Sequence, residues 1–166
     1  MEPFLDSSDV VDNGSELYER MWRDGYLFIS GLLPTGPLES LRLKLVEIAR
    51  EAGWVKAAAP MGEAIADLDG FCVEPEPKYM EVYGRMYKLQ GFHALAHHPN
   101  VIGVFERMFE GPVMPHPKLG GRNIFPQREA FTTPGHQDFV FIQGTAESYT
   151  AWIPLHDVPR EMGGLQ

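Results

Sequence analysis

Residues 136–155 read HQDFVFIQGTAESYTAWIPL, and this stretch decides the expected fold. It contains the β-type run DFVFIQ and most of a second run, SYTAWIPLHD, with a glycine-containing turn between them. Upstream, the runs VMPHPKL and RNIF follow Gly111 and alternate with further glycine and proline. Several short strands with turn signals between them favour a β-sandwich or barrel. We therefore predict an antiparallel β-core over residues 112–166.

The residues before this core carry helix signals instead. Asn13 and Glu16 have the spacing of a capping box, and Gly25 is placed to end the helix that they begin. Apolar residues at helical spacing predict two further helices, over residues 37–52 and from Pro99 to a stop at Gly111. The pattern between these helices is mixed and reads as a long loop with short strand pieces, followed by a strand or a helix at residues 83–89. The expected class is therefore α+β.

One domain with a short tail is the expected organisation. Residues 1–12 read as a mobile acidic tail, and residues 13–166 as a single domain, helical and mixed over 13–111 and β over 112–166. A chain of 166 residues is long enough to bury one hydrophobic core.

Charge and composition exclude several classes of partner. A net charge of −9 argues against a nucleic-acid surface, which needs clustered lysine and arginine. No apolar run approaches the roughly 18 residues needed to cross a bilayer, and the acidic start resembles no signal or transit peptide. Cys72 is the single cysteine and has no partner for an internal disulfide. We expect a cytoplasmic protein that binds neither nucleic acid nor membrane.

The sharpest candidate site is the tripeptide His136-Gln137-Asp138. On a strand, residues i and i+2 point to the same face, so the imidazole and the carboxylate would lie side by side. Two such ligands, with a histidine from a distant strand, form the facial triad of non-haem Fe(II) oxygenases. The bland alternative is a surface hydrogen bond between neighbouring side chains, and the tripeptide alone does not exclude it.

The segment 131–165 resembles the iron-binding segment of the phytanoyl-CoA dioxygenase family. In that family an HxD pair is followed by a strand of the type AW-x-x-L and then by Gly-x-Leu, which match residues 151–155 and 163–165 here. The resemblance implies a double-stranded β-helix (jelly-roll, cupin-like) core with flanking N-terminal helices. It also implies an Fe(II)- and 2-oxoglutarate-dependent dioxygenase that uses dioxygen to hydroxylate an unactivated C–H bond of a small organic substrate.

The resemblance assigns roles to individual residues. His136 and Asp138 match two of the three iron ligands, and they are the expected catalytic and metal-binding residues. The implied contacts to 2-oxoglutarate are Lys88, Asn123, Thr150 and Trp152. A core aromatic is an equally open reading of Trp152, and a solvated surface side chain is an open reading of Lys88. Certain halogenases of this superfamily have a small residue in place of the carboxylate, so Asp138 favours hydroxylation.

Two parts of the family's site are not found in these residues. The second iron-binding histidine and the arginine that pairs with 2-oxoglutarate lie well after Gly-x-Leu, and this chain ends at Gln166. The remaining histidines are poor substitutes, namely His93, His97, His98, His116 and His156. We therefore expect an incomplete N-terminal portion of an oxygenase. Two alternatives stay open: a non-catalytic remnant or interaction module, and a metal-binding cupin-like protein without 2-oxoglutarate chemistry. The sequence indicates neither the substrate nor the oligomeric state.

Overall fold

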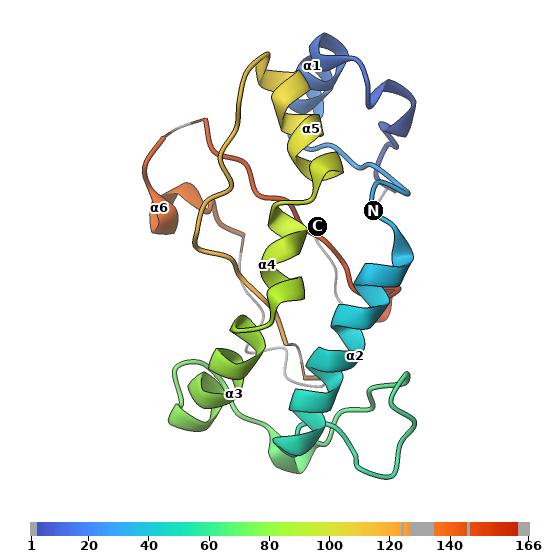
Figure 1. The fold of residues 1–166 in the computed structure, drawn as a ribbon, viewed down its shortest axis with the longest axis vertical. Coiled ribbons are helices and arrows are strands. Elements are labelled where there is room, and N and C mark those ends of the chain that lie inside the picture. The colour runs from blue at the N-terminus through green and yellow to red at the C-terminus, as the bar shows by residue number, and fades with distance from the viewer. Residues whose placement is uncertain (1–2, 124, 127–134, 146, 163–166) are drawn as a thin grey trace. The chain divides into compact units, whose positions relative to one another are not determined.

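The structure is a computed structural model that describes residues 3–123, 125–126, 135–145 and 147–162 (Figure 1). Its helices, in chain order, are η1 Ser8–Val10, α1 Gly14–Asp24, α2 Thr35–Glu51, η2 Leu68–Gly70, α3 Pro77–Tyr87, α4 Gln90–Ala96, α5 Pro99–Phe109, α6 Phe139–Ile142 and η4 Arg160–Met162. The chain divides into two compact units. The first unit comprises residues 1–38 and 89–119, and the second comprises residues 39–88 and 120–166.

The predicted β-core is wrong, and with it the α+β class and the double-stranded β-helix (jelly-roll, cupin-like) fold. Within the described ranges the chain is mostly helical and contains no strand. Its β-type pairing there is limited to two isolated bridges, Asp6 with Phe28 and Val55 with Ala66. A β-type run becomes a strand only when a neighbouring segment satisfies its backbone N–H and C=O groups. In the described residues no neighbour does so for the predicted runs.

The run DFVFIQ shows what replaces the predicted pairing. Residues 139–142 form the single-turn helix α6, in which the amide of Ile142 donates to the carbonyl of Asp138 at 2.9 Å. The amide of Gln143 likewise donates to the carbonyl of Phe139 at 2.9 Å. Local i→i−4 bonds thus take up the backbone groups that a sheet would have used. Residues 148–154, the first part of the predicted run SYTAWIPLHD, have no regular structure.

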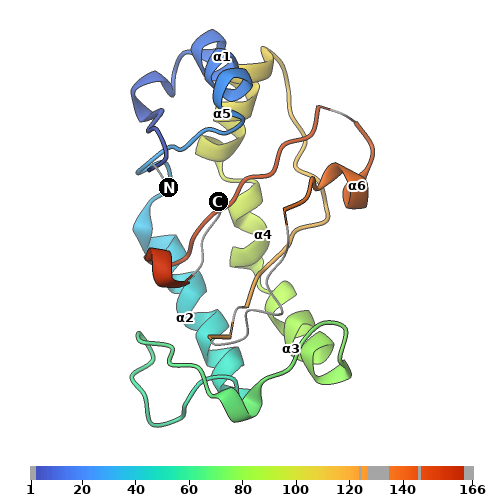
Figure 2. The same cartoon turned by 180° about the vertical axis from the view of Figure 1, so that it is seen from behind.

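The first unit is built on the pairing of α1 with α5, which lie side by side in both views (Figure 1, Figure 2). The predicted capping of α1 is confirmed. The side chain of Asn13 accepts a hydrogen bond from the amide of Glu16 at 3.3 Å, and Gly25 ends the helix with φ 78°. The side chains that α1 and α5 bury are Leu17, Val101, Val104 and Met108.

Gly14, at the start of α1, lies against the backbone of α5. A Cβ at this position would overlap the backbone carbonyl group of Arg107. Since backbone cannot yield as a flexible side chain can, we expect Gly14→Ala to lower the free energy of unfolding by about 2 kcal/mol, an overpacking cost. Urea denaturation measures this change.

The control is Gly84→Ala in α3, where an added Cβ meets nothing within 4 Å. There the better helix propensity of alanine should raise stability by about 0.5–1 kcal/mol. Equal stability of Gly14→Ala and the parent protein would contradict the close approach of the two helices.

Residues 3–12, which the sequence assigns to a mobile tail, make specific contacts within the first unit. The amide of Ser7 donates to the carbonyl of Phe28 at 2.7 Å. The hydroxyls of Ser30 and Ser8 each donate to the Asp6 carboxylate at 2.5 Å, and these hydrogen bonds lower the pKa of Asp6 to about 2. The domain boundaries at residues 12 and 13 stay a prediction.

The second unit surrounds an aromatic core. Trp54 is 2% exposed, stacks on Tyr79 with ring centroids 5.5 Å apart, and meets Phe125 edge-on at 5.8 Å. The buried cluster consists of Ala49, Trp54, Val55, Cys72, Tyr79, Val82, Met86 and Phe125. Burial raises the pKa of the Cys72 thiol, which keeps it neutral and unreactive at ordinary pH.

Helix boundaries in the sequence are largely reproduced. Helix α2 begins at Thr35, two residues before the predicted Pro37, and Gly53 follows it with φ 78°. Helix α5 begins at Pro99 as predicted, and the side chain of His98 caps it by accepting from the amide of Asn100 at 3.2 Å. The ambiguous residues 83–89 belong mainly to α3, and α4 was not predicted. No helix in the described ranges combines the length and the apolar character needed to cross a membrane.

Candidate functional site

The predicted pair His136 and Asp138 lies at the entrance to α6 in the second unit. Asp138 is the residue immediately before this helix, and His136 precedes it by two positions. The Nε2 atom of His136 lies 3.1 Å from Oδ1 of Asp138. The side chains are 38% and 41% exposed, so both are accessible to a ligand. The two groups thus lie side by side as predicted, although they stand in a turn and not on a strand.

The spacing of the pair suits two ligands of one metal ion. Two donors in neighbouring positions of an octahedral ion, each bonded at about 2.1 Å, lie about 3.0 Å apart. The observed separation of Nε2 and Oδ1 is 3.1 Å. Imidazole nitrogen and carboxylate oxygen are also the donor types of the 2-His-1-carboxylate triad.

A third ligand is not among the described residues. Across the ranges that the structure places, no three histidine, cysteine, aspartate or glutamate side chains lie close enough to hold a metal ion together. His156, in the same unit, has Nδ1 2.5 Å from the backbone oxygen of Asp157. The described residues therefore bring together two donors of the types found in a facial triad, and no third.

Thr150 contacts the pair directly. Its hydroxyl donates a hydrogen bond to Oδ2 of Asp138 at 2.5 Å. The chain reverses after α6, where Gln143 and Gly144 have φ values of 58° and 101°, and returns so that residue 150 meets residue 138. The sequence predicted Thr150 as a contact to 2-oxoglutarate and gave no sign of this bond, because the two residues are 12 positions apart.

The other predicted residues have surroundings that differ from those of Thr150. Asn123 is part-buried against the core, with Nδ2 3.6 Å from the sulfur of Met86, and it also hydrogen-bonds to the Tyr79 side chain. Lys88 is exposed at the end of α3, and Trp152 is 49% exposed. In the described part of the chain, no hydrogen bond or ion pair links Lys88, Asn123 or Trp152 to the Asp138 carboxylate. Asn123 is in a position that suits packing.

Two histidines of the first unit have structural partners. His98 caps α5, and the Nδ1 atom of His116 accepts a hydrogen bond from the amide of Lys118 at 3.1 Å. Each imidazole therefore uses its Nδ1 atom to satisfy local backbone.

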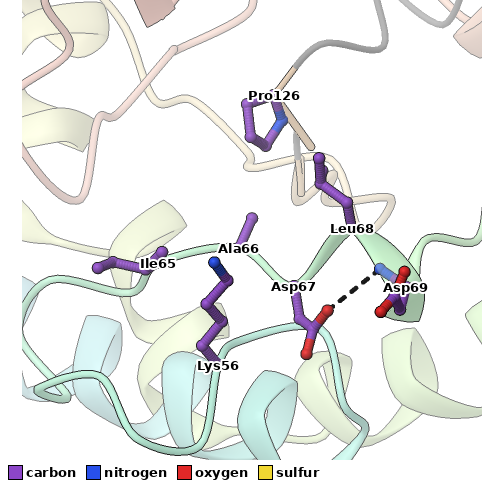
Figure 3. Close-up of a pocket in the computed structure, with 7 residues that line it drawn as sticks. All are labelled: Lys56, Ile65, Ala66, Asp67, Leu68, Asp69 and Pro126. Carbon is purple, nitrogen blue, oxygen red and sulfur yellow. Dashed lines mark hydrogen bonds between the residues drawn. The ribbon is translucent and has the colours of Figure 1, made fainter.

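A surface cavity of about 360 Å³ lies elsewhere on the second unit (Figure 3). Its lining residues are Lys56, Ile65, Ala66, Asp67, Leu68, Asp69 and Pro126. Figure 3 shows the Asp67 carboxylate accepting the amide of Asp69 at 3.1 Å, the bond that caps η2. The loop between Lys56 and Ile65 is held to α2, because the side chains of Arg42 and Arg50 each donate a hydrogen bond to a backbone carbonyl of this loop at 2.5 Å. No residue of the predicted iron site lines this cavity.

Comparison with known proteins finds one relevant similarity. The chain is 27% identical to the 1-deoxypentalenic acid 11-beta-hydroxylase of Streptomyces arenae over 168 residues. The match covers 98% of this chain and 54% of that protein, so the chain spans about half the length of the curated relative it matches. No protein-family model matches the chain, and no solved structure matches it. The chain is therefore similar to a hydroxylase along nearly all of its length.

Proposed function

We propose that the protein is an Fe(II)- and 2-oxoglutarate-dependent hydroxylase of the phytanoyl-CoA dioxygenase type, and that His136 and Asp138 are two of its iron ligands. The observation that carries the proposal is the 3.1 Å separation of Nε2 and Oδ1 in an accessible pair. The 27% identity to a hydroxylase supports the same reaction class. The relative's name describes hydroxylation of a small organic acid, and we propose a substrate of that kind.

The bound iron would supply oxidation of a C–H bond by dioxygen, with 2-oxoglutarate converted to succinate and carbon dioxide. The chain's own residues have simpler tasks. The imidazole of His136 would donate a nitrogen lone pair to the ion, and the carboxylate of Asp138 would add an oxygen donor whose negative charge offsets the positive charge of the metal. Both side chains are partly exposed, so a metal ion and a cosubstrate could reach the pair.

The proposal is tested by titrating the full-length protein with Fe(II) under anaerobic conditions and then with 2-oxoglutarate. We expect one Fe(II) per chain, 2-oxoglutarate binding that requires the metal, and slow release of succinate when dioxygen is admitted. If the protein binds Fe(II) but does not bind 2-oxoglutarate, it is a metal-binding protein without 2-oxoglutarate chemistry. If the protein does not bind Fe(II), the proposed function is wrong, and the alternative of a non-catalytic interaction module is favoured.

Trp152 is proposed to contact 2-oxoglutarate, and its exposed fraction of 49% makes it accessible to a ligand. We expect Trp152→Ala to raise the dissociation constant for 2-oxoglutarate about tenfold, the loss of about 1.4 kcal/mol of aromatic contact. The dissociation constant for Fe(II) should stay near that of the parent protein. Calorimetric titration of each ligand separately measures the two effects.

The matched control is Trp22→Ala, since Trp22 is 69% exposed on α1 in the other unit. It should leave both titrations unchanged. If Trp152→Ala has the same dissociation constant for 2-oxoglutarate as the parent protein, the assigned contact is wrong. The assignment of the iron ligands would not be affected.

A further inference from the structure

We propose that Thr150 is a positioning residue for the metal ligand Asp138. Its hydroxyl engages Oδ2, so that the carboxylate presents Oδ1 alone, beside Nε2 of His136, to the metal ion. This inference rests on the proposed function, because it assumes that the pair binds a metal. It replaces the sequence-based role of Thr150, which was a contact to 2-oxoglutarate.

The two oxygens of Asp138 have different partners. Oδ1 lies 3.1 Å from Nε2 of His136, and Oδ2 lies 2.5 Å from the hydroxyl oxygen of Thr150. A carboxylate is only an acceptor, so the Thr150 hydroxyl must be the donor. Hydroxyl-to-carboxylate bonds of about 2.5–2.7 Å are about twice as strong as neutral ones. The Thr150 bond therefore distinguishes the two oxygens and fixes the plane of the carboxylate.

Without this bond the carboxylate would be free to turn. Its terminal torsion is broad and roughly twofold, and the side chain is 41% exposed, so packing alone does not hold it. A freely turning carboxylate can chelate a metal ion through both oxygens. Chelation would use a coordination position that a facial triad keeps open for ligands. The hydroxyl of Thr150 prevents this by engaging Oδ2.

The backbone holds the two residues in place for this contact. The carbonyl of Asp138 accepts from the amides of Phe141 and Ile142, each at 2.9 Å, which anchors its backbone in α6. Gln143 then adopts φ 58° and ψ −164°, a conformation that side-chain-bearing residues rarely take. Such a conformation persists only where the surrounding structure imposes it. The chain thus leaves α6 through a backbone conformation that the surrounding structure imposes at Gln143.

Removing the hydroxyl tests the proposal. Thr150→Val keeps the side-chain shape and removes the donor, whereas Thr150→Ser keeps the donor. We expect Thr150→Val to weaken Co(II) binding about 10- to 100-fold, the usual cost of losing an outer-shell partner, and Thr150→Ser to restore it. Thr150→Ala also lacks the hydroxyl and carries the same expectation if the valine variant does not fold. Co(II) replaces Fe(II) because its visible absorption reports coordination number.

The control is Thr145→Val in the same loop, where the hydroxyl accepts a hydrogen bond from the amide of Glu147 at 3.2 Å. It should bind Co(II) as the parent protein does. In Thr150→Val the visible absorption of bound Co(II) should differ from that of the parent protein, because a chelating carboxylate takes a coordination position that another ligand holds in the parent site. Metal-free Thr150→Val and Thr150→Ser should unfold at similar temperatures, which separates positioning from stability.

Two failures are distinguishable. If Co(II) binding is lost in His136→Ala but Thr150→Val keeps the parent affinity and spectrum, the positioning role is overturned and the proposed function stands. If the parent protein binds no divalent metal, the proposed function and the inference both fall.

Discussion

Replacing His136 by alanine is expected to abolish stoichiometric Fe(II) binding by the full-length protein. The change removes one of the two donors that lie 3.1 Å apart, and Asp138 alone would hold the ion through a single carboxylate. The loss of affinity should exceed the about 10- to 100-fold that an outer-shell change costs. Anaerobic titration with Fe(II), followed by measurement of bound iron after gel filtration, detects it.

The control for this experiment is His156→Ala. His156 lies in the same unit, and its Nδ1 contacts the backbone oxygen of Asp157. We expect this variant to keep one Fe(II) per chain. One equivalent of tightly bound iron in His136→Ala would refute the ligand assignment.

Truncating Trp54 should produce the largest loss of stability. Trp54 is 2% exposed and contacts both Tyr79 and Phe125 at the centre of the second unit. Trp54→Ala should lower the free energy of unfolding by about 3–5 kcal/mol, because it removes buried apolar surface and leaves a cavity. Against a typical total of about 5–15 kcal/mol, this change would remove a large share of the protein's stability. Guanidinium denaturation of the metal-free protein measures the difference.

Trp22→Ala is the matched control for the core experiment. Its ring is 69% exposed and contacts Tyr18 on the same helix, with centroids 6.1 Å apart. We expect a change within about 0.5 kcal/mol, as for most surface substitutions. Similar losses for Trp54→Ala and Trp22→Ala would contradict the placement of Trp54 in the core.

The helices were predictable because their signals act over a few residues. Asn13 and His98 cap the helices that they precede, and Gly25 ends α1 in the left-handed conformation. Apolar spacing also identified the buried face of α2, where Leu41 is buried and Leu45 and Ile48 lie on the same side. The short helix α4 escaped prediction, since its seven residues carry no side-chain cap.

The β-core failed as a prediction for a related reason. Runs such as DFVFIQ have the composition of strands, but composition does not say whether a partner segment will pair with them. In the structure, backbone amides of this run donate hydrogen bonds to carbonyls of the same run, and the run forms the helix α6. An apolar run this short is ambiguous between helix and strand, and the surrounding chain decides which forms.

Within the site, the sequence by itself determined the adjacency of His136 and Asp138, because residues two positions apart meet in a turn as well as on a strand. Only the tertiary structure decided that Thr150 binds the second oxygen of Asp138 and that Asn123 packs against Met86. Those contacts join residues 12 and 37 positions apart, so they depend on the path of the whole chain, and no local pattern encodes that path.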